Sequence, residues 1–248
     1  MEALGQIELL FSVLVLTAAF AIRGTTGFGG NAVAVPLLTL MLPIQTVLAV
    51  ITVLTVLSSL GHWVTDWRRI VWREILRVAP FMLIGVLLGL YLFQVLDTRT
   101  LTRYFGGFVI LYAVFAMATA KRTVSLSRKL LWPLATGLSA LAGLVGTLFG
   151  GAAGPLYAIY LNTLRLDKDR FRVTITTILM VQAVLRIAGY VTLGFYDRAT
   201  LTMLAAALPL VWIGARIGDR VATRINQHTF NIVVGAVLML SGAILLVK

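Results

Sequence analysis

The stretch RGTTGFGGNAVAVP, from Arg23 to Pro36, interrupts a chain that is otherwise almost continuously apolar. It places four glycines, two threonines, an asparagine and an arginine where a membrane helix would be expected to continue. Unwound backbone is tolerated at membrane depth only where it is buried in protein or lines a polar cavity. We therefore expect this break to serve a site inside the protein.

The composition predicts an all-α polytopic membrane protein. Of the 248 residues, 60% are hydrophobic and only 12% are charged, whereas soluble domains carry about 25% charged residues. The N-terminus lacks the basic start of a signal peptide, so residues 9–23 are read as a retained helix. There is no cysteine, which excludes disulfides, thiol catalysis and Cys-ligated metals. We expect no cofactor and no metal.

Basic residues concentrate in four short segments, which hold 14 of the 21 Lys and Arg residues. The segments are 65–77, 121–129, 165–172 and 219–228. The positive-inside rule makes such loops cytoplasmic, where they also touch anionic membrane lipid. The net charge of +12 is therefore attributed to topology, and no nucleic-acid partner is expected.

The second half of the chain repeats the first. Gly24, Gly27 and Pro36 align with Gly143, Gly146 and Pro155, and further on Pro80, Gly85 and Gly89 align with Pro209, Gly214 and Gly218. We expect one integral membrane domain with a first repeat at 1–120, a cytoplasmic linker at 121–129 and a second repeat at 130–248.

Each repeat contains five apolar segments. They lie at about 7–23, 30–43, 45–64, 78–96 and 104–120, and at about 130–146, 152–164, 173–194, 199–217 and 229–247. Because five is odd, and because the basic loops must stay inside, the second repeat is predicted to be inverted in the membrane, with both termini outside. Inverted repeats are typical of secondary transporters, whose site lies near the midplane between the repeats.

Both repeats begin with a helical hairpin broken by glycines, at Gly24–Asn31 and at Gly143–Gly154. A helix that restarts after such a break presents free N–H groups and a positive dipole end, which favour an anion. The candidate binding residues in the breaks are Thr26, Gly27, Gly29, Gly30, Asn31, Gly150 and Gly151. The alternative is close helix packing, which we expect instead for the pairs Gly85/Gly89 and Gly214/Gly218.

Three arginines lie within the predicted segments. Arg186 is near the centre of segment 173–194, with Gln182 one turn away on the same face. We expect both to contact an anion, while capping of broken-helix carbonyls is the alternative for Arg186. Arg23 either contacts the anion, snorkels to the interface or holds loop carbonyls. Arg216 is expected to form an ion pair or to snorkel.

Other polar side chains are candidates for the remaining walls. Segment 45–64 offers Thr52, Thr55, Ser58 and Ser59, and the repeat alignment places Ser58 over Arg186. Such hydroxyls also bond across helices or to their own backbone. His62 is read either as an interfacial histidine or as a proton-linked gate. Tyr157 and Tyr160 either line the pathway or belong to an interfacial belt. The tryptophans near Trp67 predict a short interfacial helix.

The paired motifs TTGFGGNAVAVPLL and GLVGTLFGGAAGPLY resemble those of the TauE/SafE family of membrane permeases, and the resemblance covers essentially the whole chain. It implies export or uptake of sulfite, organosulfonates and related small sulfur-containing anions. By this resemblance Gly27, Phe28, Gly29 and Gly30 match the first family motif, and Phe149, Gly150 and Gly151 the second. Asn31 and Ala152 depart from the glycines common in the family.

We therefore expect a secondary transporter, an exporter in the bacterial inner membrane, of small sulfur oxyanions such as sulfonates or sulfite. It would work by alternating access around a midplane anion site. An anion channel and a transporter of a small carboxylate are the alternatives, and a homo-oligomer is left open. A hydrolase built on Ser58 or Ser59 with His62 lacks an acid and an oxyanion motif, so no enzyme is expected. The lack of paired buried histidines argues against a haem-binding subunit.

Overall fold

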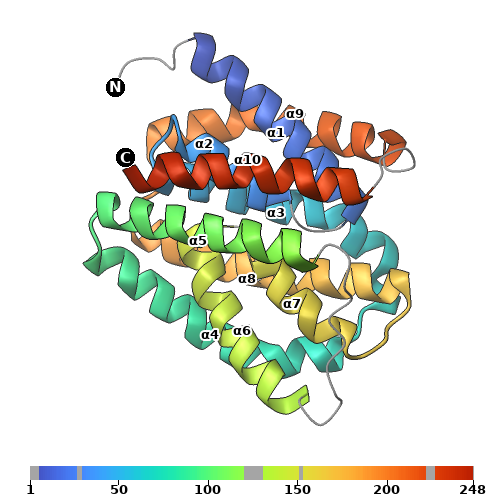
Figure 1. The fold of residues 1–248 in the computed structure, drawn as a ribbon. Coiled ribbons are helices and arrows are strands. Elements are labelled where there is room, and N and C mark those ends of the chain that lie inside the picture. The colour runs from blue at the N-terminus through green and yellow to red at the C-terminus, as the bar shows by residue number, and fades with distance from the viewer. Residues whose placement is uncertain (1–5, 27–29, 120–130, 151–152, 222–226, 248) are drawn as a thin grey trace.

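The computed structural model describes residues 6–26, 30–119, 131–150, 153–221 and 227–247. Within these residues the chain is entirely helical, with ten α-helices and one 3₁₀ turn (Figure 1). The elements are α1 (Gln6–Thr26), α2 (Gly30–Thr39), α3 (Ile44–Asp66), η1 (Trp67–Arg69), α4 (Trp72–Val95), α5 (Thr98–Thr119), α6 (Leu131–Phe149), α7 (Ala153–Asn162), α8 (Lys168–Thr192), α9 (Arg198–Val221) and α10 (Gln227–Val247). The predicted linker 121–129 lies outside the described residues.

Each predicted apolar segment corresponds to one helix. The largest differences are at the starts of α4, α5 and α8, which begin several residues before the predicted apolar segments. At α8 the carboxylate of Asp167 accepts a hydrogen bond from the backbone N–H of Arg170, which caps the extra polar turn. The short helix expected near Trp67 is a single 3₁₀ turn between α3 and α4.

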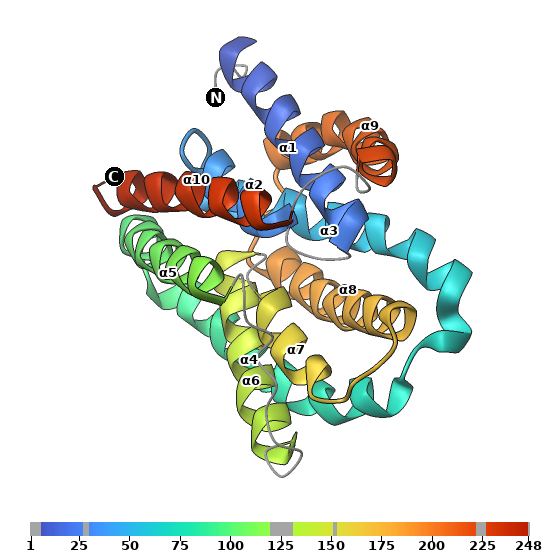
Figure 2. The same ribbon diagram turned by 45° about the vertical axis from the view of Figure 1, so that its right-hand side comes forward.

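Helices from the two halves of the chain interlock. The most extensive packing joins α4 to α6, α5 to α10 and α1 to α9, and each pair combines one helix from each half (Figures 1 and 2). α3 and α8 contact each other in the interior, and the short helices α2 and α7 pack against them. The halves therefore form one body with a shared core.

Glycines allow these helices to approach closely. A Cβ on Gly85 of α4 would lie 2.0 Å from the carbonyl oxygen of Ala140 on α6, and one on Gly89 would lie 2.7 Å from Thr147. On the other side, a Cβ on Gly214 of α9 would lie 2.8 Å from the Thr17 carbonyl oxygen of α1. The predicted packing role is confirmed for these three glycines, while the surroundings of Gly218 lie outside the described residues.

The exterior of the bundle is apolar, as a protein in a bilayer requires. Among the residues that the structure describes, three helical stretches are long and apolar enough to cross a membrane, namely Ile44–Arg69, Trp72–Val95 and Lys168–Thr192. Large hydrophobic side chains lie exposed along one face of α4: Leu83, Ile84, Leu87, Leu88 and Tyr91. This face has no described partner in the chain and suits contact with lipid.

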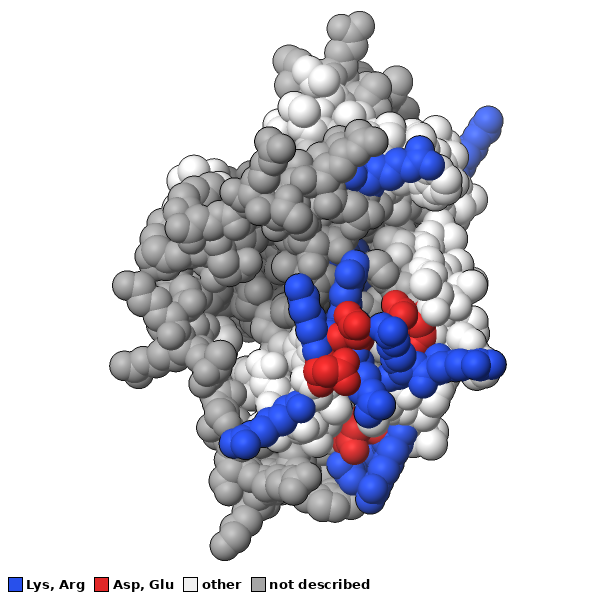
Figure 3. Space-filling view, turned by 90° about the vertical axis from the view of Figure 1, so that its right-hand side faces the viewer, with Lys and Arg blue, Asp and Glu red and all other residues white. Residues whose placement is uncertain are grey.

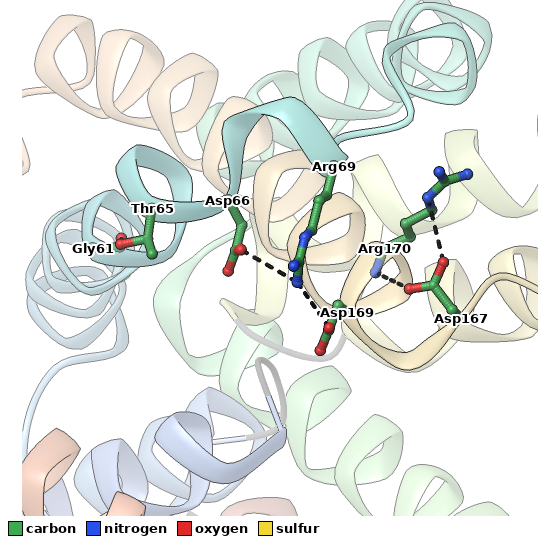
Figure 4. A network of polar contacts seen from close by, with 7 residues as sticks. All are labelled: Gly61, Thr65, Asp66, Arg69, Asp167, Asp169 and Arg170. Carbon is green, nitrogen blue, oxygen red and sulfur yellow. Dashed lines mark hydrogen bonds and ion pairs between the residues drawn. The ribbon is translucent and has the colours of Figure 1, made fainter.

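Charged side chains gather at one end of the molecule, where α3 leads into α4 and α7 leads into α8 (Figure 3). There Arg69 of η1 donates to Asp169 of α8 at 2.8 Å and lies 3.7 Å from Asp66 (Figure 4). Arg170 pairs with Asp167 at 3.3 Å. These groups are largely exposed, apart from the partly buried Asp66, so each pair contributes at most about 1 kcal/mol. The contacts join the ends of α3 and α8 at this face.

Candidate functional site

A cavity lies where the two broken hairpins meet α3 and α8. Its empty space is about 310 Å³, including the part open to its surroundings. The described residues that line it are Arg23, Asn31, Thr55, Gly146, Gly150, Ala153, Leu179, Gln182 and Arg186. The structure thus brings together six of the predicted site residues from both halves of the chain, namely Arg23, Asn31, Thr55, Gly150, Gln182 and Arg186.

Arg23 reaches the cavity from the last turn of α1, and only 5% of the residue is exposed. Its Nε donates to Ser58 Oγ at 2.9 Å, and its Nη2 donates to Ser59 Oγ at 2.8 Å. These serines lie on α3, so the guanidinium group is held in the interior. The alternative that Arg23 snorkels to the interface is wrong.

Arg186 reaches the same cavity from α8, and only 3% of it is exposed. Its Nη1 donates to the carbonyl oxygens of Gly146 and Gly150, the latter at 3.1 Å. It therefore caps carbonyls at the end of α6, which was the alternative role. Its Nε is buried and has no hydrogen-bond partner among the described residues, so one donor remains for a ligand.

Polar side chains surround the two arginines. Gln182 lies one turn from Arg186 on α8, and its Nε2 donates to the Ala142 carbonyl oxygen at 2.8 Å. Asn31 is the second residue of α2, and its Nδ2 donates to Thr55 Oγ1 at 2.7 Å. The first residue of α7 also borders the cavity, so both restarting helices begin at the site, as the sequence predicted.

The second break is shaped by backbone and ring packing. Gly150 has a φ of +74°, a conformation that side chains other than glycine adopt only with strain. The ring of Phe149 stacks on Phe105 and Phe108 of α5, with centroid distances of 5.3 and 4.9 Å. These contacts fix the end of α6 and explain both the glycine and the phenylalanine at this point of the motif.

The remaining predicted residues occupy different positions. Ser58 bonds Arg23 and does not line the cavity; Tyr157 is fully buried beyond the lining. Gly30 packs against the Ala19 carbonyl oxygen, at 2.0 Å from where its Cβ would lie. Gly27, Gly29 and Gly151 lie outside the described residues. Thr26 ends α1 and His62 lies within α3, and the side chains of both are likewise outside what the structure describes.

The polar residues of α3 behave in two ways. Thr55 lines the cavity as proposed, whereas Thr52 donates to the Leu48 carbonyl oxygen of its own helix. Sequence reasoning missed Gly146, Ala153 and Leu179 as lining residues. Leu179 precedes Gln182 by three residues and Arg186 by seven, so the helical period of α8 was the available signal.

The electrostatics of the cavity are unbalanced. Arg23 and Arg186 face the same small space, so their charges repel one another. None of the described lining residues is acidic. A charge buried at membrane depth is costly unless a counter-charge or water accompanies it. The arrangement therefore suits an anion that bridges the two guanidinium groups.

A second buried polar cluster was not anticipated. Glu74, near the start of α4, is 7% exposed and pairs with Arg77 at 2.7 Å. Tyr160 of α7 donates its hydroxyl hydrogen to Glu74 Oε2. The cluster joins α4 to α7, the short helix that follows the second break. Glu74 and Arg77 had been counted with the cytoplasmic loop, because the helix was expected to begin after them.

The two tyrosines of α7 provide a matched test of this cluster. Tyr160→Phe removes a charge-assisted hydrogen bond and should lower the unfolding free energy by about 1–2 kcal/mol. Tyr157→Phe should leave it nearly unchanged, because the Tyr157 hydroxyl has no partner among the described residues. Thermal unfolding in detergent measures both variants, and equal losses of stability would contradict the assignment.

Comparison with known proteins identifies the family of the chain. The family model described as Sulfite exporter TauE/SafE matches residues 11–245. A curated relative, the "Probable inner membrane transporter protein TsaS" of Comamonas testosteroni, is 29% identical over 195 residues, which are 77% of this chain and 79% of that protein. No solved structure matches the chain significantly. Because the family match spans nearly the whole sequence, the chain belongs to the TauE/SafE family, a family of membrane transporters and not of enzymes.

Proposed function

We propose that the protein is a secondary transporter that exports small sulfur oxyanions, such as sulfonates or sulfite, across a bacterial inner membrane. The observation that carries the proposal is the convergence of Arg23 and Arg186 on one cavity whose described lining holds no acid. The family match favours this class of cargo, and the relative is described as an inner membrane transporter. A guanidinium group matches the oxygens of a sulfonate or sulfite better than an ammonium group does.

We further propose that the chain consists of two inverted repeats, 1–120 and 130–248. The packing supports this. When α1 to α5 are matched in order with α6 to α10, the pair of α1 with α9 is equivalent to the pair of α6 with α4. The α5–α10 and α3–α8 pairs each join equivalent helices. Alternating access would then come from rocking of the interlocked helices around the cavity.

In this arrangement the charged end of the molecule faces the cytoplasm, and both termini lie outside. The connection from α4 to α5 lies at the opposite end from the charged face (Figure 1). The membrane potential, negative inside, favours export of an anion by about 2.3 kcal/mol per charge per 100 mV.

The orientation can be tested without background labelling because the natural chain has no cysteine. We expect Arg99→Cys to react with a membrane-impermeant maleimide on intact cells and Lys168→Cys to react only after permeabilisation. Both side chains are exposed, so accessibility to the reagent should depend on the side of the membrane alone. The reverse pattern, or labelling of both in intact cells, would contradict the topology.

Transport itself is tested in proteoliposomes. We expect saturable movement of sulfite or a two-carbon sulfonate down its gradient, with lactate and acetate as carboxylate controls. A channel, the main alternative, would pass large currents and show little saturation. Preference for the carboxylates would instead support the second alternative, a transporter of small carboxylates.

A further inference from the structure

The amide of Gln182 is held in one orientation. Its Nε2 donates to the carbonyl oxygen of Ala142 at 2.8 Å and lies 3.4 Å from that of Gly143. Both acceptors belong to α6. The flipped amide would place an oxygen against two carbonyl oxygens, so the network assigns the donor to this side. The remaining polar atom of the amide is therefore Oε1, which can only accept a hydrogen bond.

This acceptor is buried and unused. Gln182 is 2% exposed, lines the cavity, and its Oε1 has no hydrogen-bond partner among the described residues. Leaving such an acceptor unpaired in an apolar surrounding is costly. An anion alone does not satisfy it, because an oxyanion offers only further acceptors.

A donor lies one helical turn away. Arg186, also lining the cavity and 3% exposed, has an unpartnered Nε–H. Residues four apart on a helix lie on the same face. The α8 side of the cavity therefore carries one unpartnered donor and one unpartnered acceptor, on successive turns of the same helix face. A complementary ligand presents an acceptor to the first and a donor to the second.

We propose that the transported anion carries a hydrogen-bond donor beside its oxyanion, and that Gln182 Oε1 selects for this donor. This inference rests on the proposed function and narrows its substrate class. The oxyanion binds at the Arg186 Nε–H, and an O–H or N–H group of the same molecule donates to Gln182. Hydroxysulfonates, aminosulfonates and hydrogen sulfite meet this requirement. Sulfate at neutral pH and plain alkanesulfonates do not.

Two ligands of equal chain length provide the test. Isethionate (2-hydroxyethanesulfonate) and 1-propanesulfonate differ by a hydroxyl in place of a methyl group. Their dissociation constants are measured by calorimetry on the full-length protein in detergent. We expect isethionate to bind at least about tenfold more tightly, because its hydroxyl satisfies a buried acceptor that a methyl group leaves unpaired.

The variant Gln182→Leu assigns the selectivity to this residue. Its preference for isethionate should fall to about twofold or less, while its binding of 1-propanesulfonate remains measurable. The second value confirms that the cavity is intact. A variant that does not fold leaves the comparison of the two ligands on the natural protein as the deciding measurement.

The outcomes separate this inference from the proposed function. If the natural protein binds both sulfonates equally well, the inference is overturned and the sulfonate site remains. If the Gln182→Leu variant prefers isethionate to the same degree, another group accepts the hydrogen bond from the ligand hydroxyl. The role of Gln182 is then overturned. If neither sulfonate nor sulfite binds, the proposed function fails and the inference fails with it.

Discussion

Arg186→Ala is expected to remove saturable anion transport and to raise the dissociation constant of the anion about 30-fold or more. Truncating one side of a buried charge pair costs about 2 kcal/mol or more, which corresponds to this factor. Arg186 supplies one of the two positive charges facing the cavity and an Nε–H without a partner among the described residues. The measurement is sulfonate flux in proteoliposomes together with calorimetric binding in detergent.

A milder variant separates binding from folding. Arg186→Ala also removes the donor to the Gly146 and Gly150 carbonyl oxygens, so some loss of stability is expected. Arg186→Lys keeps the charge but lacks the planar fork, and we expect it to fold while its KM rises at least about tenfold. Arg216→Ala is the control, since Arg216 is exposed and lies over the Trp212 ring. Natural affinity in both Arg186 variants would refute the anion contact.

Gly85→Ala is expected to destabilise the bundle strongly. The new Cβ would lie 2.0 Å from the Ala140 carbonyl oxygen, which is backbone and cannot rotate away. Gly143 of α6 approaches α4 in the same way, at 2.3 Å from the Met82 carbonyl oxygen to its own added Cβ. Separating the helices should cost about 2–3 kcal/mol, which lowers the Tm by about 5–10 °C.

Gly137→Ala is the matched control on α6. An added Cβ there meets nothing within 4 Å, and alanine favours a helix over glycine by about 1 kcal/mol. Its Tm should therefore stay the same or rise. Thermal unfolding of both variants in one detergent gives the comparison. Equal Tm values for the two variants would show that α4 and α6 do not cross closely at Gly85.

The sequence was most informative at residues that are unfavourable in a membrane-spanning helix. Glycines and two buried arginines are unfavourable in a lipid-facing helix, so their presence predicted both the breaks and the site. The periodicity of apolar segments predicted ten helices, because each helix must satisfy its own backbone in the bilayer. The structure brings Arg23, Asn31, Gln182 and Arg186 to one cavity, although they come from three helices in two halves of the chain.

Pairwise contacts across the bundle could not be predicted in the same way. The sequence predicted Ser58 as part of the wall of the site, but Ser58 bonds Arg23 of its own half and does not line the cavity. The Glu74 cluster was missed because a charge near a helix start reads as a loop residue. Such contacts depend on how helices rotate and tilt against each other, which single-sequence periodicity does not determine.

Each arginine joins the first and third helices of its own half, but the two arginines do not project from equivalent helices. Arg23 projects from the first helix of its half and bonds the third, α3. Arg186 projects from the third helix of its half, α8, and bonds the end of the first, α6. Each half therefore contributes one positive charge to the cavity from a different position. The site is asymmetric even if the repeats are related by a two-fold axis.

The most direct test of the central claim is the thermal unfolding of the purified protein with and without a candidate anion. An anion that bridges Arg23 and Arg186 should stabilise the folded state by about 2.7 kcal/mol at 100 times its dissociation constant. We expect the Tm to rise by about 5–10 °C with sulfite or isethionate, not with equal chloride, and not in Arg186→Ala. No rise with any anion, or an equal rise in the variant, would contradict an anion site in this cavity.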